Sequence, residues 1–420
     1  MTDKHEQKKH DIINTAFVQW SRDLYTNTSL TVVAEAMNMT KPALFRYFPS
    51  KESLCDAMIE TFTSDLEVFA DRFINEIEHG TLQESFAILI DKGFDFFISH
   101  SDRHYFLFFT SPMIKPQIMN KDIFGSYRSK TIQLICDQYR AAKGISLSEE
   151  SCEQILFFCF YTAVSVYMYR RKYIYRTDLA NMTEAMLDET KRIILDALFN
   201  GLRQNTNDKT VLSDEDFMRI ENEIIGSETL IQRDKVFEAI TSVIAQDGIV
   251  NASMDRIAKA MGFNSKSSLY SHFTSRDNML QQLFENESDL ILNYVKANGL
   301  KYDNFNEDLY GCMAATFCYF TADANVLKYF DWLHYQMIRE SVNPCPKTKL
   351  RMFGILTEEI NRRHNISFDA ENGASVTAVV LLSTYIVRLI VRKNEKNGGT
   401  TSSEEVRDLR EIYKIYMEGI

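Results

Sequence analysis

The sequence predicts an all-α protein built from two similar copies in tandem. Only 15 of the 420 residues are glycine and 6 are proline, which leaves little material for tight turns. Leu, Ile, Met, Phe, Glu, Lys and Gln recur at spacings of three and four residues, which is the period of amphipathic helices. A single core stops growing near ~250–300 residues, so a chain of this length suits two or more helical domains.

The internal repeat is visible by comparing the two halves. Residues 43–48 read ALFRYF and residues 268–273 read SLYSHF, at an offset of 225 (273 minus 48). Ser50 and Ser275 follow these segments, each placed to cap the next helix. Far downstream, FNGL at 199–202 and MEGI at 417–420 match at an offset of 218 (417 minus 199). A repeat this long indicates a duplicated domain, because solenoid units run only ~20–50 residues.

The repeat and the composition together predict five parts. We expect a helix-turn-helix domain at 8–55, a helical regulatory domain at 56–203, a linker at 204–230, a second helix-turn-helix-like domain at 231–280 and a second regulatory domain at 281–420. The polar run at 204–210 has the composition of an exposed connector. An amphipathic stretch from about Asp214 to Ile225 follows it and stops at Gly226.

The first helix-turn-helix begins with an amphipathic helix, whose apolar residues are Ile12, Ile13, Ala16, Phe17 and Trp20. Thr28 is placed to cap a short second helix, with an apolar stripe of Leu30, Val33, Ala34 and Met37. Asn38 and Met39 make the turn. Thr40 can cap the third helix, and Pro42 fits its first turn, where a missing N–H costs nothing. Leu44 and Phe48 lie four residues apart and are expected to point inward.

These residues carry a family resemblance. The segment resembles the helix-turn-helix of the tetracycline repressor (TetR) family at Thr28-Ser29-Leu30, Val33-Ala34, Met39-Thr40-Lys41, Leu44-Phe45, Phe48 and Ser50-Lys51-Glu52. The resemblance implies DNA-binding helices followed by a variable helical domain, which binds a small ligand and dimerises through its last two helices. Carried over by position, the base-reading residues are Thr40, Lys41, Pro42, Ala43 and Arg46, with Tyr47 and Lys51 on phosphates.

The second copy departs from this pattern in its turn. Seven steps separate Gly262 from Leu269, whereas six separate Asn38 from Leu44, and one residue rotates a helix by about 100° unless the turn absorbs it. The aligned DNA-binding residues are Ser265, Lys266, Ser267, Ser268, Tyr270, Ser271 and His272, with Arg276 in place of Lys51. We expect this segment to bind DNA. The alternative is that it is a structural relic, or that its third helix binds DNA in an altered orientation.

The regulatory domains are rich in aromatic residues, for example around Phe94 and Phe157 in the first copy and Phe317 and Trp332 in the second. Aromatic residues at helical spacing mostly form core, and a minority line a ligand pocket. A small apolar or aromatic effector fits such domains, and nothing in the sequence names it. His100 and His104 lack a third ligand for a metal, so no metal or cofactor is expected. The basic residues 170–172 are expected to complement a helix dipole rather than to bind DNA.

Composition and motifs narrow the class of protein. The net charge of -11 does not exclude DNA binding, because a DNA reader needs only a local basic surface. The seven cysteines form no CxxC pair, and the N-terminus has no signal-peptide core, so we expect a cytoplasmic protein that neither spans nor binds a membrane. The chain contains no G-x-S-x-G, phosphate-binding glycine loop or H-E-x-x-H, so no enzyme activity is expected.

The sequence thus predicts a DNA-binding regulator, a repressor by the resemblance, that acts as an intramolecular pseudo-dimer. The family's dimer bundle maps onto 151–172 and 179–200 in copy one and onto 371–393 and 402–418 in copy two. The two heads differ in sequence, so the expected partner is double-stranded DNA with two unlike half-sites. Further self-association stays open. The alternative is a helical interaction or ligand-binding protein in which the second head, or both heads, no longer bind DNA.

Overall fold

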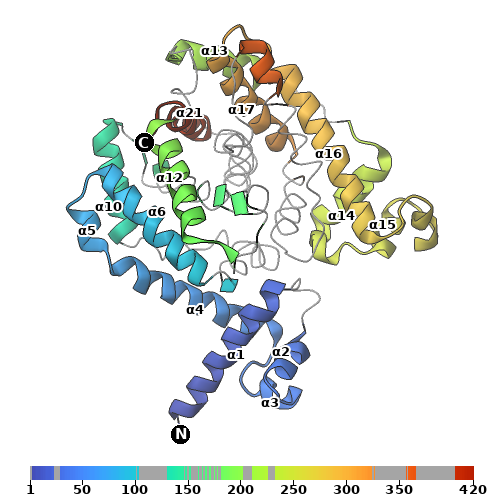
Figure 1. Cartoon of the computed structure of the whole chain (residues 1–420). Coiled ribbons are helices and arrows are strands. Elements are labelled where there is room, and N and C mark those ends of the chain that lie inside the picture. Colours follow the sequence, from blue (N-terminus) through green and yellow to red (C-terminus); the bar gives the residue numbers. More distant parts are fainter. Residues whose placement is uncertain are drawn as a thin grey trace. The chain divides into compact units, whose positions relative to one another are not determined.

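The computed structural model is helical, as the sequence predicts. It describes residues 2–22, 29–100, 102–103, 130–145, 181–201, 211–225, 232–323, 358–365 and 403–420, together with isolated residues between these ranges. Within these residues the regular elements are α-helices and short 3-10 segments, and there is no β-strand (Figure 1). None of the described helices is long and apolar enough to cross a membrane.

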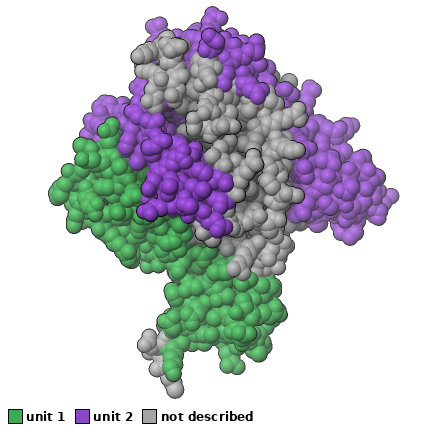
Figure 2. Space-filling view, in the orientation of Figure 1, with its two compact units in different colours: residues 1–135, 331–343 green, residues 136–330, 344–420 purple. Residues whose placement is uncertain are grey.

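The chain divides into two compact units (Figure 2). Unit 1 comprises residues 1–135 and 331–343, and unit 2 comprises residues 136–330 and 344–420. Unit 1 contains the first helix-turn-helix, and unit 2 contains the second. The five parts expected from the sequence were defined by the repeat, whereas these two units are defined by contacts within the fold. The boundaries of the five parts therefore remain predictions.

The first helix-turn-helix consists of α1 (Thr2–Arg22), α2 (Leu30–Ala36) and α3 (Lys41–Phe45), and α4 (Lys51–Asp71) leaves it. The expected apolar positions are buried in its core: Ile12, Ile13, Ala16, Phe17, Trp20, Leu30, Val33, Ala34, Leu44 and Phe48. Met37, expected in the same stripe, is only half-buried at the end of α2. The helical spacing therefore identified this core correctly, apart from that one edge position.

The capping residues follow the sequence pattern with one correction. The Ser29 side chain caps α2 by accepting from the Val32 amide, so the cap lies one residue after Thr28, which is outside the described residues. Ser50 and Ser53 form a reciprocal capping box at the start of α4, as expected for Ser50. Thr40 occupies the cap position of α3 without a side-chain hydrogen bond to the helix.

The described part of the first regulatory domain consists of α5 (Ile74–Glu78), α6 (Leu82–Ser99), α10 (Lys130–Lys143) and α12 (Glu184–Asn200). Phe94 and Phe96 on α6 are buried, in line with their predicted core role. Phe157 and Trp332 lie outside the described residues.

The basic run at 170–172 has a partner that the sequence did not predict. Arg170 and Arg171 are buried. Arg170 lies 3.2 Å from the Glu189 carboxylate and donates a hydrogen bond to the Tyr175 hydroxyl at 2.8 Å. Charge pairing inside the fold, and not a helix dipole alone, therefore accounts for Arg170. Lys172 is outside the described residues.

The second copy begins with α14 (Lys235–Asn251), α15 (Met254–Ala260) and the 3-10 helix η5 (Lys266–Ser271), and α16 (Arg276–Gly299) leaves the head. The regulatory part continues with α17 (Phe305–Ala322) and ends with α21 (Ser403–Glu418). Almost every residue of α17 is buried, because α16 packs along one of its faces and α13 (Asp214–Ile224) along another.

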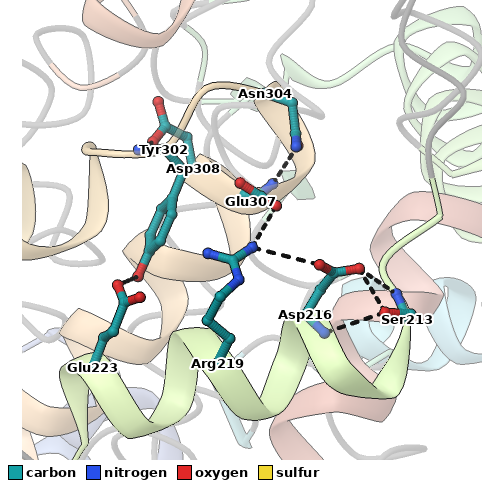
Figure 3. Close-up of polar contacts among 8 residues, drawn as sticks. All are labelled: Ser213, Asp216, Arg219, Glu223, Tyr302, Asn304, Glu307 and Asp308. Carbon is teal, nitrogen blue, oxygen red and sulfur yellow. Dashed lines mark hydrogen bonds and ion pairs between the residues drawn. The ribbon is translucent and has the colours of Figure 1, made fainter.

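Helix α13 is the amphipathic stretch expected within the linker. Its acidic first turn is capped by Ser213, and Arg219 joins Asp216 on the same helix to Glu307 on α17 (Figure 3). Glu221 accepts from Arg410 of α21 at 2.6 Å and from the Tyr310 hydroxyl at 2.6 Å. The helix is therefore an integral part of unit 2.

The last helices of the two copies, α12 and α21, pack against each other within unit 2 (Figure 1). Their ends meet closely: a Cβ atom on Gly201 would lie 2.6 Å from the Met417 carbonyl, and one on Gly419 would clash with the Phe199 carbonyl. The offset of 218 that places Gly419 on Gly201 also places Met417 on Phe199. The two contacts are therefore reciprocal. The other two bundle segments, 151–172 and 371–393, lie largely or wholly outside the described residues.

Candidate nucleic-acid interface

The third helix of the first head presents a polar face beside a buried one. Leu44 and Phe48 anchor α3 in the core, and this fixes which side faces outward. Thr40, Lys41, Pro42 and Arg46 are exposed, whereas Ala43 and Tyr47 are half-buried. A short helix with exposed cationic and small residues on one face has the chemistry needed in a major groove.

The start of helix α1 contacts residues that directly follow α3. Helix α1 begins at Thr2, so it starts before the predicted head at 8–55. The His5 ring stacks on Tyr47 with ring centroids 4.7 Å apart, and the Lys9 ammonium lies 5.9 Å from the centre of the Phe48 ring. Tyr47 is half-buried because the His5 ring covers it. The sequence alone did not reveal this contact, because His5 lies outside the repeat.

Lys51, expected as a phosphate contact, is half-buried at the start of α4. Its ammonium lies 5.8 Å from the centre of the Trp20 ring. Burial lowers the pKa of Lys51 to about 8, and the neighbouring Cys55 opposes that shift. The charge that this residue would offer to a phosphate therefore depends on pH near neutrality.

The turn of each helix-turn-helix contains one residue with a left-handed backbone. Asn38 has a φ of 53° and Gly262 a φ of 76°, and these two residue types adopt that region most easily. The next residues make the same bond, from the Met39 amide to the Ala34 carbonyl and from the Phe263 amide to the Ala258 carbonyl, both at 2.8 Å. The two turns therefore start alike.

The extra residue of the second copy is absorbed after that bond. Leu269 and Phe273 are 0% and 3% exposed, matching 0% and 2% for Leu44 and Phe48. The buried side of the third helix is therefore kept, and the rotation of about 100° does not occur. What changes is the helix type, because η5 is a 3-10 helix where α3 is an α-helix.

The aligned residues of the second head are accessible. The exposed set contains Ser265, Lys266, Ser267, Ser268, Tyr270, Ser271 and His272. Several already have partners within the head: Lys266 lies 3.7 Å from the Asp255 carboxylate, and the Ser271 hydroxyl donates to the Ser268 carbonyl at 2.6 Å. His272 stacks on Phe263 with ring centroids 6.1 Å apart.

Arg276 differs from Lys51 in its surroundings. Its Nε donates to the Ala252 carbonyl at 3.2 Å, and burial lowers its pKa. An arginine keeps its charge over the physiological range even so. Its predicted role on phosphates is untested, and one of its donors is already committed to the head itself.

An exposed aromatic residue was missed in the first head. Phe45 is 38% exposed on α3, with the Lys41 ammonium 5.7 Å from its ring centre. The offset of 225 places Phe45 on Tyr270, which is 50% exposed and was included in the predicted site. Applying the repeat in both directions would have identified Phe45 from sequence.

The comparisons with known proteins agree with this geometry. The sequence model described as "Bacterial regulatory proteins, tetR family" matches twice, at residues 12–58 and 236–283. The chain carries two TetR-family segments in tandem. Each TetR-like segment spans the helix-turn-helix and the first turns of the helix that follows it. The chain is therefore a transcription regulator with helix-turn-helix DNA-binding segments.

Other comparisons add less. The chain is similar to the transcriptional regulator FadR from Bacillus subtilis, solved in complex with stearoyl-CoA, at 19% sequence identity and a TM-score of 0.35. That match covers 44% of this chain and 97% of the FadR chain. No curated protein sequence matches. Across the described residues, no group of three or more His, Cys, Asp or Glu side chains could hold a metal ion.

Proposed function

We propose that this chain is a cytoplasmic transcriptional repressor that binds one DNA operator with both of its helix-turn-helix heads, as an intramolecular pseudo-dimer. The reciprocal contact between the ends of α12 and α21 carries the proposal. A two-fold interface pairs residue i with j and residue j with i, and Gly201 with Met417 and Gly419 with Phe199 meet that condition within one chain. This contact between the last helices of the two copies supports a pairing like that of two subunits.

Duplication has two consequences for DNA recognition. Covalent linkage removes the association entropy that a homodimer must overcome. It also allows the heads to differ, and Pro42, Phe45 and Arg46 are replaced by Ser267, Tyr270 and Ser271 at the aligned positions. We therefore propose an operator with two unlike half-sites, about 34–36 Å apart between centres or a multiple of that distance.

The proposed DNA contacts are the predicted residues of both heads. Thr40, Lys41, Pro42, Ala43 and Arg46 would contact base edges, with Tyr47 and Lys51 on phosphates. In the second head the proposed contacts are Ser265, Lys266, Ser267, Ser268, Tyr270, Ser271 and His272, with Arg276 on phosphates. The exposure of most of these side chains supports the assignment.

A small apolar or aromatic effector is a further part of the proposal. Buried aromatic rings on α6 and α17, such as Phe94 and Phe317, give both regulatory domains the side chains that line such sites elsewhere. A ligand controls DNA affinity only if it favours one arrangement of the heads over another. A thermal-shift screen of small molecules, followed by DNA titration with each molecule that binds, tests this part.

Selection of bound sequences from a random DNA pool tests the main proposal, together with light scattering on the free protein. We expect a one-chain particle and a consensus of two unlike half-sites. A stable two-chain particle in which copy one pairs only with copy one, or a consensus symmetric to the base, would overturn the pseudo-dimer.

A helical interaction protein without DNA binding is the competing function. A mobility-shift series at several salt concentrations separates the two, since phosphate contacts give a steep dependence of affinity on salt.

A further inference from the structure

An arginine bridge ties the second head to the helices that follow it. Arg233 lies just before α14 and is almost fully buried. Its Nε and Nη2 donate to the two oxygens of the Glu287 carboxylate at 2.6 and 3.2 Å, and its Nη1 lies 2.9 Å from the Asp323 carboxylate. The Tyr319 hydroxyl also donates to Glu287, at 3.1 Å.

The four residues of this bridge come from three different elements. Arg233 precedes the first helix of the head, Glu287 lies on the connecting helix α16, and Tyr319 and Asp323 lie on and at the end of α17 in the regulatory domain. The Glu287 side chain is 0% exposed, so its charge depends on Arg233 for compensation. Bidentate pairing of a guanidinium with a carboxylate also restricts their relative orientation.

The first head has a bridge at the same junction, built from different residues. Arg103 follows α6, the counterpart of α17, and forms an ion pair with Asp65 on α4. It also donates to the Asn14 side chain of α1 at 2.9 Å and lies 5.5 Å from the centre of the Phe17 ring in the core of the head. One arginine again joins the first helix of the head, the connecting helix and the end of a regulatory helix.

The direction of the bridge is reversed between the copies. The arginine comes from the regulatory domain in copy one and from the head in copy two. The family match that begins at Ile12 and Val236 gives an offset of 224 (236 minus 12), which places Arg233 on Lys9 and not on any residue of the first bridge. The connection is therefore shared by the copies, while the residues that make it are not.

We propose that Arg103 and Arg233 are positioning residues for DNA binding, each holding its own helix-turn-helix at a fixed orientation to the regulatory domain of the same copy. Neither residue contacts DNA in this proposal, which rests on the proposed two-headed function. Within the described residues, the bridge adds to the connecting helix and to apolar contacts, which have no preferred direction. The bridge supplies the directional contact that sets where the reading helix points.

The test uses the full chain and the DNA selected by the wild type. Arg233→Met and Arg103→Met remove the guanidinium and keep an unbranched side chain of similar length. Arg363→Met is the matched control, because Arg363 pairs with Asp308, a 0% exposed carboxylate like Glu287, entirely within the second regulatory domain. Arg233→Met with Glu287→Gln removes both charges of the buried pair and so tests the bridge without leaving the Glu287 charge unpaired, while Asp323, which is 22% exposed, keeps access to water.

We expect Arg233→Met to bind the complete operator roughly tenfold more weakly, while its affinity for a DNA carrying only the second half-site stays within about twofold of wild type. One base pair inserted between the half-sites rotates them by roughly 35° and should weaken wild-type binding strongly but the variant only slightly. Arg103→Met should show the same pattern with the first half-site. A purely structural role would lower half-site affinity and leave the spacing preference unchanged.

Each outcome separates the bridge from the proposed function. A wild-type chain that selects no DNA overturns both. A wild type that binds its operator, with Arg233→Met and the double variant both keeping the wild-type spacing preference, overturns the bridge alone. Equal broadening in Arg363→Met would also overturn it, because that control lies away from the heads.

Discussion

Asn38 and Gly262 hold the same left-handed backbone conformation at the same point of the two helix-turn-helix turns, with φ angles of 53° and 76°. An alanine there costs about 1–2 kcal/mol, while asparagine reaches this region through local hydrogen bonding. Open space surrounds Gly262, so the cost is one of backbone conformation alone. We expect Gly262→Ala to destabilise the second head by about 1–2 kcal/mol, and Gly262→Asn by less than half of that, measured by amide hydrogen exchange in α15 and α16. Equal exchange in the two variants would contradict this account.

Two exposed cations, Lys41 on α3 and Arg46 at its C-terminal cap, are expected to contribute differently to DNA binding. Lys41→Ala should weaken binding to all DNA sequences and lower the slope of log affinity against log salt by about 1, as for a phosphate contact. Arg46→Ala should cost about 1–3 kcal/mol and relax preference at particular bases. Lys92→Ala on α6 is the control, because that exposed lysine lies outside the head. Wild-type affinity in both α3 variants would show that the assigned face is wrong.

We expect Lys51 to make DNA binding depend on pH. Burial lowers its pKa to about 8, so its charge is lost as the pH rises from about 7 to 9, and affinity should fall over that range. Stability should move the other way, because between about 8 and the ordinary value of 10.5 the unfolded chain binds more protons than the folded one. Lys51→Arg keeps its charge and should remove the affinity step, as titrations at several pH values would reveal. A step that persists in this variant would assign it to another group.

The contact between the copies can be tested by substituting two glycines that share the same φ angle. Gly201 and Gly144 both have a φ of 61°, but a Cβ atom on Gly144 meets nothing within 4 Å, whereas one on Gly201 meets the Met417 backbone. Gly144→Ala should cost about 1–2 kcal/mol through strain alone. Gly201→Ala should cost clearly more, because its ψ of -173° lies in a region open essentially to glycine alone and because α12 and α21 must also separate at their ends. Urea unfolding of the three proteins measures the difference, and equal costs would mean that the close approach contributes nothing.

The pairing of α13 with α21 is expected to stabilise unit 2. Glu221→Ala removes the partner of Arg410 and of the Tyr310 hydroxyl, and we expect a loss of about 2 kcal/mol. The loss should fall below that of a fully buried pair, because the Arg410 side chain is 23% exposed and can regain water. Glu223→Ala, at a more exposed neighbour on α13, should cost less than about 1 kcal/mol. Hydrogen exchange in α13 compares them, and similar protection in the two variants would rule out a special role for Glu221.

Local sequence pattern determined much of this protein. The helical class, the tandem repeat, the core of the first head and the exposed set Lys41, Arg46 and Lys266 all followed from spacing and from the offset of 225. These features depend on contacts three or four residues apart, or on comparing the chain with itself. The same logic explains the misplaced cap of α2: Thr28 and Ser29 are both good caps, and only the helix start at Leu30 decides between them.

The tertiary structure decided what distant residues do to one another. The extra residue in the second turn could have rotated η5. The burial of Leu269 and Phe273 in the core shows that it does not, and residue spacing alone does not predict this. The buried state of Arg170, the reciprocal approach of Gly201 and Gly419, and the bridges of Arg103 and Arg233 join residues from different helices. The sequence does not show whether a charged side chain lies in water or in a core. The packing of the helices determines which group pairs with a buried charge, and only such a partner offsets the cost of burying it.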